Sequence, residues 1–258
     1  MHHSIRFSAI LLCVFALTHC GGGGEKPAEE AVRTGPVVSP DLVNGATVTG
    51  KVAFTGSAPA PKPIDMSANP QCERAHKDHP VTAEDIVVNP NHTLRNVFVW
   101  IKTGVPALNW AVPSTPAALD QKFCMYQPHV LGAMTGQAVS IANDDPVNHN
   151  IHPIPQTNEE WNDVQSPGEA PKLRTFPRQE VMIPIKCNVH PWMRAYLGIV
   201  SHPFFAVTAE DGSFTIKGLP PGTYTVQAWH EKFGTQEQQV TVGAKESKAV
   251  DFSYSYKE

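Results

Sequence analysis

Short stretches in which apolar and polar residues alternate recur along this chain, and proline or glycine ends most of them. Near the C-terminus, Ser213–Lys217 carries Phe214 and Ile216 on one face, and Leu219-Pro220-Pro221-Gly222 then turns the chain. A period of two residues is typical of a half-buried β-strand. The 24 prolines and 18 glycines among 258 residues would also interrupt helices. The sequence therefore predicts an all-β protein, with a polar surface loop over residues 156–178.

The N-terminus has the features of a secretion signal. Arg6 precedes a short apolar run, Phe7–Leu17, which is too short to span a bilayer, so residues 1–20 are predicted to be a signal peptide. Leu17-Thr18-His19-Cys20 resembles a bacterial lipoprotein cleavage site, which implies that Cys20 carries a lipid. Plain secretion with a free Cys20 is the alternative. Residues 21–43, with their glycine, proline and glutamate content, are expected to form a flexible tether.

These features predict a location in the periplasm or at the cell surface, with the lipid on Cys20 as the membrane anchor. The formal net charge of −4 argues against nucleic acid as a partner, because binding to phosphates needs a basic surface. In an oxidising compartment Cys72, Cys124 and Cys187 then remain. Two of the three can pair, and metal ligation is a good reason to keep the third reduced.

The segment Cys187-Asn188-Val189-His190-Pro191-Trp192-Met193, here called the ligand loop, holds a thiol, an imidazole and a thioether. Soft sulfur donors combined with imidazole suit copper in both of its oxidation states. Cys187 is in phase with the apolar Val181, Ile183 and Ile185 of the preceding strand, so its thiol is predicted to point into the core. The loop needs one more histidine, and His149 is in phase with apolar Ile151, whereas His152 points the other way.

Cys-x-x-His-Pro-x-Met preceded by His-Asn-Ile-His resembles the cupredoxin family, with a short, amicyanin-like ligand loop, over about residues 121–202. The resemblance implies a Greek-key β-barrel with one type 1 (blue) copper held by His149, Cys187, His190 and Met193. It further implies that Asn150 hydrogen-bonds the ligand loop and steadies the sulfur. His190 would reach the surface as the port for electrons. Pro191 and Trp192 beside it would form a docking patch, or would simply pack in the core.

Cys72 and Cys124 are the remaining pair. A structural disulfide between them is predicted, and it would stabilise the fold by ~2–4 kcal/mol. The alternative is a second metal site, in which His76 and His129 join the two sulfur atoms.

The string from Asp211-Gly-Ser-Phe to Gly222-Thr-Tyr-Thr-Val resembles the carboxypeptidase regulatory-like, or transthyretin-like, β-sandwich family. Val48–Val52 looks like the first strand of that family. This resemblance implies a discontinuous sandwich made of residues 44–104 and 203–258, with the cupredoxin domain, residues 105–202, inserted between them. A cupredoxin that starts near Thr93 and is followed by a separate tail domain is the alternative.

The predicted function is that of an electron carrier between redox proteins, such as a cytochrome or a dehydrogenase. An enzyme is not expected, because residues 21–258 lack the His-x-His pairs that hold the additional coppers of multicopper oxidases. Copper capture or delivery is one alternative function. A surface interaction module with a vestigial copper site is another.

Overall fold

The computed structural model describes residues 34–78 and 80–256. The predicted signal peptide, Cys20 and the first part of the tether lie outside these residues. The described part forms 19 strands and one short helix, which confirms the predicted all-β class, and none of its helices could cross a membrane. In chain order the elements are β1 (Val37–Val38), β2 (Ala46–Thr55), α1 (Pro70–Ala75), β3 (Phe98–Thr103), β4 (Asn109–Trp110), β5 (Ala117–Lys122), β6 (Met125–Gln127), β7 (Val130–Met134), β8 (Ala138–Asn143), β9 (His149–Pro153), β10 (Asp163–Gln165), β11 (Lys172–Thr175), β12 (Glu180–Lys186), β13 (Arg194–Val200), β14 (Phe205–Val207), β15 (Ser213–Leu219), β16 (Gly222–His230), β17 (Gly234–Val242), β18 (Ser247–Ala249) and β19 (Phe252–Ser255).

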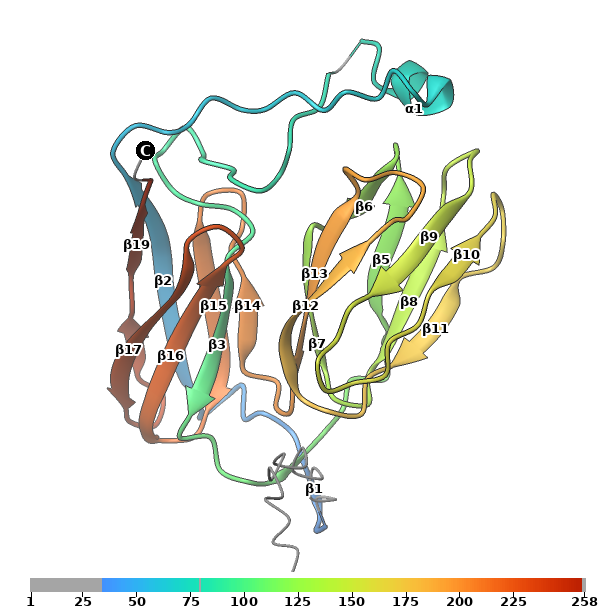
Figure 1. Ribbon diagram of the computed structural model, residues 1–258. Coiled ribbons are helices and arrows are strands. Elements are labelled where there is room, and N and C mark those ends of the chain that lie inside the picture. Colours follow the sequence, from blue (N-terminus) through green and yellow to red (C-terminus); the bar gives the residue numbers. More distant parts are fainter. Residues whose placement is uncertain (1–33, 79, 257–258) are drawn as a thin grey trace, which may run out of the picture. The chain divides into compact units, whose positions relative to one another are not determined.

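Strands from the two ends of the described chain pair with one another and form what we call the terminal sandwich (Figure 1). One sheet has the order β14-β3-β16-β17, and the other has the order β15-β2-β18, with β19 also paired to β2. The predicted alternation holds in β15, where Phe214 and Ile216 are buried in the shared core and Lys217 is exposed. β2 and β3 pair with strands that follow residue 204, so the segment 104–204 lies between the two parts of the terminal sandwich in the sequence. The domain boundaries themselves stay a prediction.

The strands between these ends form a second pair of sheets, the central sandwich. Their orders are β10-β9-β12-β13-β7 and β11-β8-β5-β6, and the pairs β5–β8 and β7–β13 are parallel. The prediction of a loop over residues 156–178 is wrong in part, because β10 and β11 lie there and extend the two sheets as edge strands. In β12 the register shifts between Glu180 and Ile183, where Met182 has a φ of 70°. Beyond that bulge Ile183, Ile185 and Cys187 all point into the core, as predicted.

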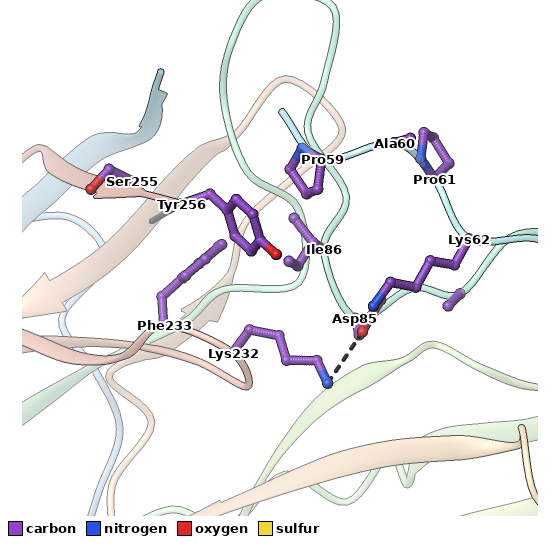
Figure 2. A pocket seen from close by; sticks show the side chains of 11 residues that line it. Pro59, Ala60, Pro61, Lys62, Asp85, Ile86, Lys232, Phe233, Ser255 and Tyr256 are labelled. Atoms are coloured by element: carbon purple, nitrogen blue, oxygen red, sulfur yellow. Dashed lines mark ion pairs between the residues drawn. The ribbon is translucent and has the colours of Figure 1, made fainter. Parts of the chain in front are cut away.

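Between β2 and β3 the chain leaves the terminal sandwich, carries α1 and returns (Figure 1), and we call residues 56–78 and 80–92 the excursion. Its helix was not predicted; Pro70 occupies its first turn, where a missing N–H costs nothing. The excursion and the terminal sandwich together line a cavity of about 440 Å³. Figure 2 shows the ion pair between Asp85 and Lys232, 3.2 Å long, that joins the two across this cavity.

A buried ion pair links the two sandwiches. Nε2 of His129, just before β7, lies 2.5 Å from Oε1 of Glu231, which follows β16, and the hydroxyl of Tyr196 donates to the other carboxylate oxygen at 3.1 Å. The side chains of His129 and Glu231 are only 5% and 8% exposed. Burial lowers the pKa of His129, but the hydrogen bond to Glu231, together with the charges of Glu231 and Glu84, outweighs burial and raises the pKa above its ordinary value. Burial raises the pKa of Glu231, but the hydrogen bonds from His129 and Tyr196, together with the charge of His129, outweigh burial and lower the pKa.

Replacement of Glu231 with glutamine should lower the free energy of unfolding by roughly 2 kcal/mol near pH 6, because a charged hydrogen bond is lost. The contribution of His129 is complete below its unfolded pKa and is lost as the pH rises through its raised folded pKa. That of Glu231 is complete above its unfolded pKa and is lost as the pH falls through its lowered folded pKa. The difference between wild type and variant should therefore peak between about pH 4.5 and 6.5.

Urea unfolding of both proteins from acid to alkaline pH measures this difference. Glu237→Gln is the control, because Glu237 pairs with Lys102 at the surface, where both side chains are 42% exposed and an ion pair contributes little. A difference between wild type and Glu231→Gln that stays constant with pH would contradict the assignment of this pair.

Candidate metal centre

Three of the predicted ligands meet at one end of the central sandwich. His149 begins β9, Cys187 follows β12, and His190 lies in the ligand loop between β12 and β13. Nδ1 of His190 is 2.9 Å from Nδ1 of His149 and 3.7 Å from Sγ of Cys187. The three side chains are at most 3% exposed, and their donor atoms all lie within 4.8 Å of one another. This arrangement could hold one metal ion.

The local pairing of strands explains why these donors meet. Lys186, the last residue of β12, pairs with His152 on one side and with Arg194 on the other, so β9 and both ends of the ligand loop are neighbours. The loop closes on itself, since the amide of Cys187 donates to the carbonyl of Met193 at 3.2 Å and the amide of Met193 donates to that of His190 at 2.9 Å. Met193 is fully buried in the same core cluster as Cys187.

His152 lies apart from these donors, as its strand phase predicts. Its Nε2 is 2.7 Å from a carboxylate oxygen of Glu160, and its Nδ1 is 3.2 Å from the side-chain oxygen of Asn188. Both ring nitrogens are thus engaged away from the cluster of metal donors.

Cys187 is the one free cysteine among the described residues, and its surroundings favour the thiolate form. Burial raises its pKa, but hydrogen bonds from His149, His190 and the backbone amide of Asn150 outweigh burial and lower the pKa to about 5. The thiolate is the form that binds metals. Asn150 contacts this sulfur through its backbone, because its amide N–H donates to Sγ at 3.3 Å while its side chain donates to Asn162.

Asp145 is a residue of this site that the sequence did not reveal. Its Oδ2 lies 2.9 Å from Nε2 of His149 and accepts the amide of Cys124 at 2.7 Å, and its Oδ1 accepts the amide of Phe123 at 2.6 Å. Burial lowers the pKa of His149, but the hydrogen bonds to Asp145 and Cys187, together with the charges of these two groups, outweigh burial and raise the pKa. The carboxylate therefore fixes the ring so that Nδ1 faces the other two donors. The one feature of the sequence that could have indicated this role is the position of Asp145, four residues before His149.

Cys72 of α1 and Cys124 form a disulfide, so they do not hold a metal together with the side chains of His76 and His129. His76 instead contacts the carbonyl of Phe123, and His129 pairs with Glu231. Sγ of Cys72 lies 3.6 Å from Nε2 of His190. The expectation that His190 reaches the surface is wrong, because the disulfide and the excursion cover it and leave the residue only 2% exposed.

The two residues predicted to form a docking patch differ in their surroundings. Pro191 is exposed, whereas Trp192 is partly buried, donates from Nε1 to the carbonyl of Cys124 at 3.0 Å and has its ring centre 5.2 Å from that of His190. Trp192 thus packs against the site. Its part in docking stays a prediction.

Comparison with known proteins gives two kinds of match. The family model for the carboxypeptidase regulatory-like domain matches residues 200–255, which run from the end of β13 to the end of β19 in the terminal sandwich. No curated protein matches the chain.

Solved structures of copper proteins give partial matches. The copper-containing nitrite reductase of Thermus scotoductus SA-01 is 21% identical with a TM-score of 0.31; the match covers 38% of this chain and 24% of the reductase, so the chain spans about a quarter of its length. A purple cupredoxin from Nitrosopumilus maritimus is 22% identical with a TM-score of 0.28, covering 32% of this chain and 98% of its own. A point mutant of amicyanin in its oxidised state is 20% identical with a TM-score of 0.30, covering 39% and 97%. These TM-scores all lie below 0.5, so the assignment of the metal centre rests on the distances between its donor atoms and not on these matches.

Proposed function

We propose that this chain holds one type 1 copper ion through His149, Cys187, His190 and Met193 and carries single electrons between redox proteins outside the cytoplasm. The observation that supports the proposal is the convergence of one thiol and two imidazole Nδ1 atoms on a buried point. A thiolate, two imidazoles and a weak axial thioether form the donor set of blue-copper sites. Copper, when bound, would supply a one-electron couple between Cu(I) and Cu(II).

The protein's own contribution is to keep the donors in place. Asp145 orients His149, the amide of Asn150 donates to the sulfur, and the hydrogen bonds within the ligand loop fix the spacing of Cys187 and Met193. Ligands held in this way cannot rearrange freely when the charge of the ion changes. A site that rearranges little is suited to electron transfer.

The proposal includes no catalytic role. It also places the protein in the periplasm or at the cell surface, attached to a membrane through a lipid on Cys20, with a cytochrome or a dehydrogenase as the redox partner. These parts rest on the sequence features described above.

Copper capture or delivery is the alternative function for the same donors. Burial of all three donor side chains, each at most 3% exposed, opposes fast exchange of the ion with an acceptor. This burial favours a resident ion over a transported one. A vestigial site in a surface interaction module is less well supported, because the donor atoms are still arranged around one point.

Visible absorption and electron spin resonance of the copper-loaded protein test the proposal. The wild type should show an intense band from charge transfer between Cys187 and Cu(II), and the band should vanish on reduction and return on oxidation. Cys187→Ser should lack the band because no thiolate remains. Val189→Ala is the matched control in the same loop, since Val189 is 49% exposed and should leave the band unchanged. A colourless copper complex that does not cycle would favour copper handling instead.

A further inference from the structure

A second group of three possible donor atoms lies on the other side of His190. Sγ of Cys72, Sγ of Cys124 and a ring nitrogen of His190 all lie within 4.8 Å of one another, and each residue is at most 2% exposed. Nδ1 of His190 faces Cys187 and His149, whereas Nε2 faces Cys72 at 3.6 Å. One imidazole therefore stands between two donor groups. In the second group the two sulfur atoms are joined as a disulfide.

The spacing of this second group fits a small soft ion. Around a three-coordinate ion with sulfur at about 2.3 Å and nitrogen at about 2.0 Å, the two donor types lie about 3.7 Å apart. The observed separation of Cys72 and His190 is 3.6 Å. Opening the disulfide would convert two sulfur atoms that cannot act as thiolates into two that can.

We propose that reduction of the Cys72–Cys124 disulfide creates a second binding site for a soft monovalent cation such as Cu(I), made of the two thiolates and Nε2 of His190. In this step a dithiol reductant attacks one sulfur and then closes its own disulfide. Two electrons pass to the pair, and each cysteine sulfur gains a proton. The cation displaces these protons when it binds.

Sharing of His190 sets the relation between the two sites. A neutral imidazole has a single unprotonated nitrogen, so the ring can serve one site at a time. The second site would thus act as a loading position from which the ion passes to Cys187 and His149, and this role rests on the proposed function. Oxidation of Cys72 and Cys124 would then remove two donors from the second site and hold α1 over His190.

The covering segment is thin enough to open. α1 has six residues, of which Cys72 is buried, and it contacts the central sandwich through the disulfide and, at its C-terminal end, through His76 and the carbonyl of Phe123. Before the helix, Met66 packs into the core of the central sandwich. The neighbours of Cys72, Gln71 and Glu73, are exposed. A reductant therefore needs α1 to lift, without rearrangement of the central sandwich.

The test uses the full chain with Cys187→Ser, which removes the first site, so that failure here is separate from failure of the proposed function. The metal-free variant is kept oxidised, or is reduced with a phosphine that is then removed without air. Both forms are titrated with Cu(I) against a coloured chelator. The reduced form should bind a single Cu(I) ion with a near-ultraviolet thiolate band, and the oxidised form should bind at least about tenfold more weakly.

Two further variants decide whether the site is the one described. Adding Cys72→Ser and Cys124→Ser should abolish the binding, and adding His190→Ala should weaken it about tenfold or more while both thiols remain. Circular dichroism checks that each reduced variant keeps its β-structure. Equal Cu(I) binding by the oxidised and reduced forms, unchanged binding after His190→Ala, or loss of the fold on reduction would each overturn the proposal.

Discussion

Replacing Asp145 with asparagine is expected to weaken copper binding by about ten- to a hundredfold, the range found when a group that orients a metal ligand is removed. All three contacts of this carboxylate are made to donors, namely two backbone amides and Nε2 of His149. Asparagine has one acceptor oxygen and an NH₂ group, so the NH₂ must face at least one N–H. Even where the amide oxygen takes the place of Oδ2, His149 would exchange the charged carboxylate that holds its Nδ1 towards Cys187 and His190 for a weaker, neutral acceptor.

The same substitution should also destabilise the fold, because a buried donor without an acceptor costs about 1–3 kcal/mol. Asp144→Asn is the matched control. Its side chain is 57% exposed and lies 3.8 Å from Lys122, so its loss should change neither copper affinity nor stability measurably. Competition titration with a chelator gives the affinity, and urea unfolding of the metal-free protein gives the stability. Equal copper affinity for Asp145→Asn and Asp144→Asn would contradict the role given to Asp145.

The parts of the site that the sequence predicted are those that local periodicity determines. Cys187 follows Ile183 and Ile185 on one face of β12, and His149 shares a face with Ile151, so strand phase alone directs both side chains inwards. The bulge at Met182 escaped prediction because a positive φ at a non-glycine residue has no local signal. The bulge separates Val181 from the predicted face, but the direction of the Cys187 side chain is unaffected because Ile183 and Ile185 follow the bulge.

The parts that the sequence did not predict depend on contacts between distant segments. Cys72 reaches His190 across 118 residues, and nothing near either residue indicates that α1 covers the ligand loop. Asp145 stands in a polar turn, where a carboxylate is ordinarily exposed, and only the approach of residues 123 and 124 buries it. The sequence therefore predicts the donors, but it predicts neither the helix α1 that covers them nor the carboxylate that orients His149.

Phe98→Ala is expected to lower the free energy of unfolding by about 3–5 kcal/mol, the usual cost of removing a fully buried phenylalanine. Phe98 belongs to β3 of the terminal sandwich, but its ring lies against the backbone of the central sandwich. A Cβ built on Gly198 of β13 would stand 2.5 Å from this ring, and one built on Gly132 of β7 would stand 2.9 Å from it. The ring also stacks on Phe205 with centres 5.7 Å apart. The cavity would therefore open between the two sandwiches.

This location predicts more than a loss of stability. Phe98 shares its small core cluster with residues of both sandwiches, whereas Cys187 and Met193 belong to a cluster within the central sandwich and the excursion. Phe98→Ala should thus split thermal unfolding into two transitions while leaving the copper charge-transfer band unchanged. Phe214→Ala is the control, since Phe214 packs against Phe252 and Gly50 of the terminal sandwich and its loss should not separate the transitions. A single transition in Phe98→Ala would contradict the role given to Phe98 between the two sandwiches. A changed band would mean that the terminal sandwich helps to hold the metal centre directly.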